Sequence, residues 1–333
     1  MRNNSFDLIR HLAALMVLVS HHFALSGLEE PGIAGYNSLG GIAVTAFFSI
    51  SGLLISQSFF NSRSFADYLG KRVVRIFPAL ILCAFVMTYL AGAVFADGYV
   101  TSFGALADFL RISVFGRANI EPITQGFILS ESFNGSLWTL KIEFGFYLLL
   151  ALALGMYRRA LMPWVLLTVF AVATYALGNH VPGALAQKLA VYSAAGIAFF
   201  AGAVIAFNQQ YLSDRRVLAI ALVTAAGLIF FSLGTPLASV LATLGVCLAT
   251  LSLGLLYVDK TIRRRFDISY GMYLYAFPVQ QLIINKTSLT FIPSMLVSAL
   301  IVIVLATVSW RLVEQPALQF VHRRKHALAA TQP

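Results

Sequence analysis

Long apolar runs alternate with short polar connections along the whole chain. Each run is close to the roughly 17 to 25 residues that an α-helix needs to cross the hydrocarbon core of a bilayer. Ten runs have this length, over residues 8–26, 40–60, 76–96, 137–156, 161–178, 184–206, 217–233, 237–257, 267–284 and 294–314. The pattern predicts an all-α, polytopic membrane helical bundle of about ten transmembrane helices, forming a single domain over 1–333 with no fused soluble domain.

Basic residues are concentrated in every second connection, with only Arg111, Arg117 and Lys286 in the others, and this gives the helices a direction. If the N-terminus is cytoplasmic, all inward connections are basic, at Arg63, Lys71, Arg72, Arg75, Arg158, Arg159, Arg215, Arg216, Lys260, Arg263, Arg264, Arg265, Arg323, Arg324 and Lys325. Because cytoplasmic loops are rich in Lys and Arg, we expect an inner-membrane protein with both termini in the cytoplasm and a basic cytoplasmic tail over 317–333. Topology also explains the net charge of +10, so we expect a lipid bilayer and no nucleic acid as partner.

Composition and cysteine usage narrow the class further. The chain is 59% hydrophobic and 11% charged, which excludes an ordinary soluble domain. Cys83 and Cys247 lie inside apolar runs, and neither has a cysteine or histidine at metal-ligand spacing. We therefore expect two small core residues, with no disulfide and no metal site.

The longest connection, 97–136, falls outside by the same rule. Within it, Leu106, Phe109, Leu110 and Ser113 recur at helical spacing, which predicts an interfacial helix. Two interpretations stay open. The connection either caps an outward-facing substrate groove or is a connector seated in lipid.

The first span carries ionisable side chains that are costly within hydrocarbon and usually face a protein interior or a cavity. Arg10 and His21 are eleven residues apart, almost three whole helical turns, so they share a helix face at depths roughly 16 Å apart. His22 points about a third of a turn away. These residues predict a functional site; an ordinary anchor helix with a snorkelling arginine is the alternative.

The fourth span carries Lys141 and Glu143 into the hydrocarbon, with Tyr147 one turn beyond Glu143. In the ten-helix topology, Glu143 and His21 lie at a similar depth below the outer surface. This coincidence predicts a polar centre in the outer half of the bundle. The alternative is a structural role for Glu143, paired with Lys141 or with a backbone donor.

Two further patterns have both a structural and a functional interpretation. Small residues recur every three or four positions in the second span, at Gly41, Thr45, Ser49, Gly52 and Ser56. They favour a helix-packing face over direct substrate contact. Lys71, Arg72 and Arg75 crowd the cytoplasmic mouth, where they suit either phosphate groups or anionic lipid.

The ninth and tenth spans have polar features too. The ninth is rich in tyrosine and contains Pro278, which predicts a kinked helix lining a cavity. The tenth carries Arg311 and Glu314 three residues apart, which favours a structural ion pair on one helix face.

A resemblance now emerges from motifs spread along the chain. The motifs are FDLIRHLAALMVLVSHH, FFSISGLLI, RVVRIFP, SLWTLKIEFGFY, SYGMYLYAFPV and SWRLVEQPAL, in this order. Over nearly its whole length the chain resembles the acyltransferase 3 family of integral-membrane acyltransferases. The most specific elements are Arg10 and His21, separated by ten residues, and SLWTLxxE, matched by residues 136–143. Ala276 stands where many members have histidine, so no role is carried over to it.

The resemblance implies transfer of an acyl group, most often acetyl from acetyl-CoA, to a hydroxyl of an extracytoplasmic polysaccharide, a lipid-linked saccharide or a small molecule. CoA is cytoplasmic and polyanionic, so its phosphates are expected at Arg72 and Arg75, with Arg10 deeper in the membrane. Its pantetheine arm is comparable in length to the axial rise from Arg10 to His21. His21 would then be the general base and Glu143 would orient the imidazole.

The remaining candidates are expected to line the cavity or contact the substrate: His22, Ser49, Ser51, Trp138, Lys141, Tyr147, Tyr273 and Tyr275. A transporter or flippase of a lipid-linked sugar is the alternative function, in which the same ions form a substrate or proton path. A signalling or scaffold protein without catalysis is a third. The glycan, the hydroxyl, the acyl group, an acyl-histidine intermediate and a homo-oligomeric state stay open.

Overall fold

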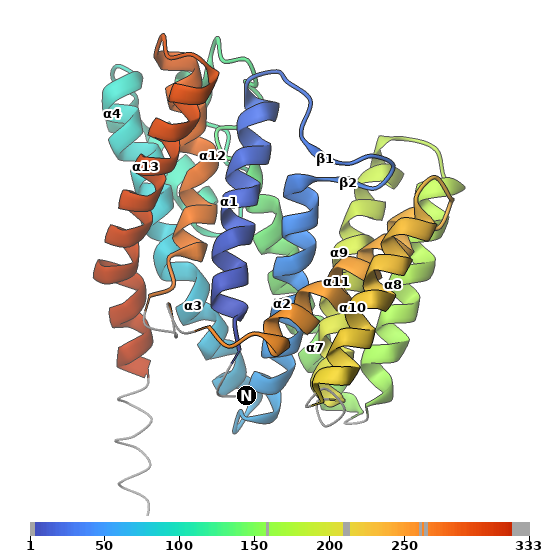
Figure 1. Ribbon diagram of the computed structural model, residues 1–333. Helices are drawn as coiled ribbons and strands as arrows, with labels where there is room; N and C mark the ends of the chain where they lie inside the picture. The colour runs from blue at the N-terminus through green and yellow to red at the C-terminus, as the bar shows by residue number, and fades with distance from the viewer. Residues whose placement is uncertain (1–3, 158–159, 209–213, 260–261, 263–265, 322–333) are drawn as a thin grey trace, which may run out of the picture. The chain divides into compact units, whose positions relative to one another are not determined.

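The computed structural model describes residues 4–157, 160–208, 214–259, 262 and 266–321, and helices dominate this part of the chain (Figure 1). Among these residues, nine helical stretches are long and apolar enough to cross a membrane. They are Phe6–Leu25, Leu39–Phe60, Phe65–Phe95, Gly135–Met156, Leu161–Asn179, Ala184–Phe207, Arg215–Ser232, Ala238–Leu256 and Phe291–Val321. Each coincides with one of the predicted runs, so the prediction of an all-α, polytopic membrane bundle is confirmed. Most of the predicted basic tail lies outside the described residues.

The ninth predicted run forms α12 (Ser269–Lys286), which is more polar than the other long helices. Its tyrosines and glutamines lower its hydropathy, yet every residue from Ser269 to Gln281 is buried. A helix that is buried on all sides is surrounded by protein rather than by lipid. The polar side chains of α12 therefore need partners within the protein.

The described residues form two compact units. The first comprises residues within the ranges 1–20, 30–62 and 142–265, and the second comprises those within 21–29, 63–141 and 266–333. Two of the boundaries fall inside helices, α1 (Phe6–Leu25) and α7 (Trp138–Met156). Each unit has its own set of packed helices.

In the first unit, α2 (Leu39–Phe60) packs closely against α9 (Ala184–Phe207). A Cβ atom at Gly52 would overlap the carbonyl oxygen of Phe199, and one at Gly202 would overlap that of Ser49. Small residues allow two helix backbones to approach this closely. The packing interpretation of the small-residue stripe is thus confirmed at Ser49 and Gly52.

The remaining helices of the first unit are α8 (Leu161–Asn179), α10 (Arg215–Ser232) and α11 (Ala238–Leu256). In Figure 1, α10 and α11 lie side by side. The start of α1 is tied to α11, because the N–H of Ser5 donates to the carbonyl of Gly254 at 2.9 Å. Phe6 then packs into a buried apolar cluster with Ile50, Leu53 and Leu251.

A two-stranded antiparallel hairpin, β1 (Gly32–Ile33) and β2 (Asn37–Ser38), precedes α2. The Ser38 hydroxyl accepts the N–H of Gly41 at 3.2 Å and so caps the helix. Tyr36 in the hairpin turn makes a 3.1 Å hydrogen bond with the Thr243 hydroxyl, and burial raises the pKa of this phenol to about 12. The connection is therefore held against α11 rather than extended into solvent.

In the second unit, α3 (Phe65–Phe85) continues through a π-turn, η1 (Val86–Leu90), into α4 (Ala91–Phe95). α12 and α13 (Phe291–Ser309) lie side by side in Figure 1. A second π-turn, η5 (Trp310–Glu314), follows α13. A π-turn adds a residue to the helical turn, which changes the direction of the side chains around it.

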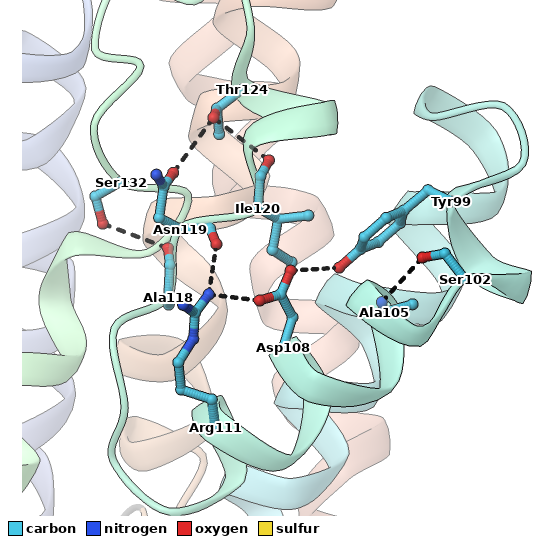
Figure 2. A network of polar contacts seen from close by, with 10 residues as sticks. All are labelled: Tyr99, Ser102, Ala105, Asp108, Arg111, Ala118, Asn119, Ile120, Thr124 and Ser132. Carbon is cyan, nitrogen blue, oxygen red and sulfur yellow. Dashed lines mark hydrogen bonds and ion pairs between the residues drawn. The ribbon is translucent and has the colours of Figure 1, made fainter.

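The connection 97–136 folds into η2 (Tyr99–Thr101), α5 (Phe103–Ser113) and α6 (Glu121–Thr124), and its last residues begin η3 (Gly135–Leu137). Figure 2 shows its polar network. The Asp108 carboxylate accepts the Tyr99 hydroxyl at 2.8 Å and Arg111 Nη2 at 2.5 Å, and Arg111 Nη2 also donates to the Asn119 carbonyl at 2.9 Å. Burial, followed by the hydrogen bond to Asp108, raises the pKa of the Tyr99 phenol, so the phenol stays a neutral donor.

This connection is also fastened to α12. Gln281 is fully buried, and its amide donates to the carbonyls of Leu129 at 2.8 Å and Ser132 at 2.9 Å. The predicted helix is present as α5, and it exposes apolar side chains at Phe103, Leu106, Leu110 and Val114. An exposed apolar row of this kind suits a membrane interface, and the interfacial position stays a prediction.

Candidate active site

The two adjacent histidines of α1 have different surroundings in the second unit. His21 is half-buried, and its ring meets the ring of Phe277 from α12 edge-on, with centroids 5.2 Å apart and planes at 75°. His22 is fully buried. The helical phase predicted from the sequence, in which the two imidazoles face different neighbours, agrees with this arrangement.

His22 is held by three polar groups. The Gln280 amide donates to Nδ1 at 3.1 Å, so Nδ1 is the acceptor and Nε2 carries the proton. Nε2 then lies 2.9 Å from the Ser294 hydroxyl and 3.2 Å from the Phe291 carbonyl. His22 is thus a neutral imidazole that links α1 to α12 and α13.

The Glu143 carboxylate lies in the first unit, within a compact group of hydroxyls. Oε1 accepts the Ser51 hydroxyl at 2.5 Å and the Tyr147 hydroxyl at 2.6 Å, and these two hydroxyls are 3.1 Å apart. Tyr147 is one turn beyond Glu143 on α7, whereas Ser51 comes from α2. Across the described residues, both hydrogen bonds to the carboxylate fall on Oε1, and none falls on Oε2.

The described residues show neither of the structural partners considered for Glu143, which were Lys141 and a backbone donor. Lys141 is exposed, and the described residues place no ion pair between Lys141 and Glu143. The carboxylate is instead fixed by hydroxyl donors, which hold its rotamer and leave one oxygen for a further donor. A carboxylate held in this way can orient an imidazole or accept a substrate hydroxyl.

Arg75 lies in a cluster that joins α3, α12 and η5 in the second unit. Its Nη2 is 2.5 Å from the Asp267 carboxylate and its Nη1 is 3.8 Å from the Glu314 carboxylate. The rings of Tyr270 and Trp310 flank the guanidinium, with centroids 5.8 and 5.9 Å from Cζ. Two carboxylates and two rings together hold this arginine in place.

The cluster corrects the predicted ion pair between Arg311 and Glu314. That prediction assumed regular α-helix geometry, in which residues three apart share a face. The two residues lie instead in the π-turn η5, where Glu314 is buried and faces Arg75 while Arg311 is exposed. The Ser309 hydroxyl also donates to Glu314, at 3.2 Å.

Two of the other aromatic candidates, Trp138 and Tyr273, lie at the start of α7. The Tyr273 hydroxyl of α12 donates to the Ser136 carbonyl at 2.8 Å and lies 2.5 Å from the Thr139 hydroxyl. Tyr275 is buried, and Trp138 is half-buried at the first position of α7. Tyr273 therefore connects α12 to the SLWTL motif.

The predicted site residues divide between the two units. Arg10, Ser49, Ser51, Glu143 and Tyr147 belong to the first. The second contains His21, His22, Arg72, Arg75, Trp138, Lys141, Tyr273 and Tyr275. A direct contact between His21 and Glu143 stays a prediction.

Residues that contact the predicted site and were not singled out from the sequence include Asn134, Asp267 and Phe277, whereas Gln280 was noted only as a polar end of the ninth span. Gln280 and Phe277 touch the two histidines, and Asp267 pairs with Arg75. One sequence signal was available for Asn134. Pro278 in a buried helix frees a backbone carbonyl, and a buried polar side chain has to satisfy it.

Comparison with known proteins identifies the family. Residues 3–312 match the acyltransferase 3 family model, described as an acyltransferase domain. The chain belongs to the acyltransferase 3 family. An O-acetyl transferase of Shigella phage Sf6 is 37% identical to it over 321 residues, which cover 94% of this chain and 96% of the relative.

A second relative of this acyltransferase is more distant. Nodulation protein 10 of Rhizobium leguminosarum bv. viciae is 30% identical over 358 residues, which cover 95% of this chain and 93% of the relative. No solved structure matches the chain. Together with the apolar helices, the family and the O-acetyl transferase relative support a multi-pass membrane O-acyltransferase.

Proposed function

We propose that this acyltransferase moves an acyl group, acetyl in the first instance, from cytoplasmic acyl-CoA to a hydroxyl of an extracytoplasmic or lipid-linked glycan. It would do so in the inner membrane with both termini in the cytoplasm. The observation that carries the proposal is the full-length relationship to a protein named as an O-acetyl transferase. The basic inward connections and the polar groups within apolar helices support the proposed direction of transfer.

In the proposed reaction, His21 takes the proton of the acceptor hydroxyl as its oxygen attacks the thioester carbonyl. The carbon–sulfur bond then breaks, and the thiolate takes the proton from the imidazolium and leaves as CoA. A sugar hydroxyl is a poor nucleophile at neutral pH, and a positioned imidazole speeds such a step by about 10²–10⁴-fold. Glu143 would orient the imidazole and stabilise its charged form.

We assign different roles to the three candidate arginines, Arg10, Arg72 and Arg75, because their surroundings differ. Arg75 already contacts two carboxylates, which compete with phosphate for its guanidinium. Arg72 and Arg10 are half-buried, and we assign the CoA phosphates to Arg72 with Arg10 deeper in the membrane. Arg75 would then support the donor site indirectly, by holding α3 against α12 and η5.

This division predicts different effects for two glutamine variants. Arg72→Gln should raise the KM for acetyl-CoA tenfold or more, because a charge-assisted hydrogen bond contributes about 1.5–3 kcal/mol. Arg75→Gln should mainly lower thermal stability, because it leaves the Asp267 and Glu314 carboxylates buried without their cation. Steady-state kinetics and thermal denaturation of the purified variants measure both effects.

Lys71 supplies the matched control on the same helix. It pairs with Asp67 at 3.0 Å, one turn away, so Lys71→Gln should leave the donor KM close to that of the wild type. If Arg72→Gln had normal abundance and an unchanged donor KM, Arg72 would be reassigned to membrane anchoring.

The experiment that tests the proposed function uses purified protein in lipid nanodiscs. It is incubated with acetyl-labelled acetyl-CoA and a panel of de-O-acetylated bacterial saccharides. We expect a saccharide that carries label removable by mild base, as an O-acetyl ester is. A transporter or flippase would move saccharide across a proteoliposome membrane without forming an ester, and that result would contradict the proposal.

A further inference from the structure

Pro278 leaves one carbonyl of α12 without its helical partner. In an α-helix each N–H bonds to the carbonyl four residues earlier, and proline has no N–H. The carbonyl affected is that of Leu274, whose side chain is fully buried. An unsatisfied buried carbonyl is destabilising, so another donor has to reach it.

Asn134 supplies that donor. Its Nδ2 lies 2.9 Å from the Leu274 carbonyl oxygen, and the Cys83 thiol is a weaker second donor at 3.5 Å. Its Oδ1 accepts the hydroxyl of Ser136 at 2.7 Å and the N–H of Ser136 at 3.3 Å, which caps the helical turn that leads into α7. The buried Asn134 amide thus joins the carbonyl that Pro278 frees in α12 to the start of α7, through its nitrogen and its oxygen.

Gly135, which follows Asn134, packs closely against the same segment of α12. A Cβ atom at Gly135 would lie 2.7 Å from Cζ of Phe277, so the Phe277 ring rests on the glycine backbone. The same ring also meets the imidazole of His21 edge-on, with centroids 5.2 Å apart. Phe277 immediately precedes Pro278, so it lies next to the position at which α12 lacks a helical N–H donor.

We propose that Asn134 is a positioning residue for the transfer reaction. By occupying the carbonyl that Pro278 frees, it holds α12 in its kinked form and keeps Phe277 packed against the His21 imidazole. The inference rests on the proposed function, in which His21 is the general base. It gives a role to the turn formed by residues 134–136, which leads into the SLWTL motif. It also explains why a proline is tolerated in the buried part of α12.

The test uses Asn134→Ala alone and together with Pro278→Ala. The single variant leaves the Leu274 carbonyl unsatisfied, so we expect lower thermal stability, a kcat at least tenfold lower and a donor KM within twofold of the wild type. In the double variant, the restored N–H of residue 278 satisfies the carbonyl, so thermal stability should recover. kcat should stay low, because α12 is straighter and Phe277 is displaced.

Two further variants separate positioning from general folding. Phe277→Leu leaves the backbone hydrogen bonds in place, and we expect it to lower kcat at least tenfold with an unchanged donor KM and an altered pH profile of kcat. Thr88→Val is the control: it removes a buried hydroxyl of the second unit that makes no hydrogen bond within the described residues, and it should keep the wild-type kcat.

Wild-type kcat in Phe277→Leu, or in a folded Asn134→Ala/Pro278→Ala protein, would overturn the positioning role. Different outcomes test the proposed function itself. It is overturned if the wild-type protein forms no ester, or if His21→Ala transfers acyl groups at the wild-type rate, whatever the Asn134 variants do.

Discussion

His21→Ala is expected to lower the rate of acyl transfer by about 10²–10⁴-fold, the range that a positioned general base contributes. Alanine removes the group with the intrinsic pKa best placed to accept a hydroxyl proton near neutrality. The His21 ring is half-buried rather than fully buried, so protein abundance should stay near that of the wild type. Product formation by membranes with matched amounts of enzyme measures the effect.

His22→Ala is the internal control for this prediction. His22 is chemically identical and adjacent, but it is fully buried and fixed as a neutral imidazole by Gln280, Ser294 and the Phe291 carbonyl. Its loss leaves the Gln280 amide without this acceptor, so thermal stability should fall while a measurable rate remains. An active His21→Ala protein beside an inactive, folded His22→Ala protein would reverse the assignment.

Glu143→Gln should lower transfer by about 10²-fold or more, the lower end of the range for general-base catalysis. Glutamine keeps the size of the side chain, and its carbonyl oxygen can still accept the Ser51 and Tyr147 hydroxyls, but it cannot stabilise an imidazolium by its charge. Ser51→Ala and Tyr147→Phe each remove one donor from Oε1, so each should have a smaller effect. Rates at saturating donor concentration report these losses.

The matched control for Ser51→Ala is Ser56→Ala on the same helix. The Ser56 hydroxyl is buried too, but it donates to the Gly52 carbonyl of its own helix at 2.8 Å and makes no contact with Glu143. Ser56→Ala should therefore keep the wild-type rate. If Glu143→Gln transferred acyl groups as fast as the wild type, the carboxylate would have a structural role only.

The helices could be predicted from the sequence because the bilayer sets their length. Apolar runs of sufficient length coincide with helices at each predicted position, including α12, whose tyrosines lower its hydropathy. The small-residue stripe of α2 could be interpreted correctly as well. Glycine and serine at helical spacing allow a close backbone approach, and α9 supplies the partner at Gly52 and Ser49.

The partners of the polar residues could not be predicted in the same way. The partner of Glu314 depends on a π-turn, and no periodicity marked the change from α-helical geometry at residues 310–314. Asp267 and Arg75 are 192 residues apart, so no local spacing connects them. Asn134 and Leu274 are likewise 140 residues apart, and only the kink at Pro278 relates them.

Transfer across a sealed membrane tests the proposed reaction most directly. The wild-type protein is reconstituted into proteoliposomes, and its orientation is scored with an impermeant maleimide at Asn61→Cys, an exposed position between α2 and α3. Labelled acetyl-CoA is supplied only on the side of Asn61, and the de-O-acetylated saccharides only on the other side. We predict base-labile label on the saccharide with the wild-type protein and none with His21→Ala. If label formed only when donor and acceptor were on the same side, transfer across the membrane would be contradicted. If label formed equally well with His21→Ala, the role of this histidine would be contradicted.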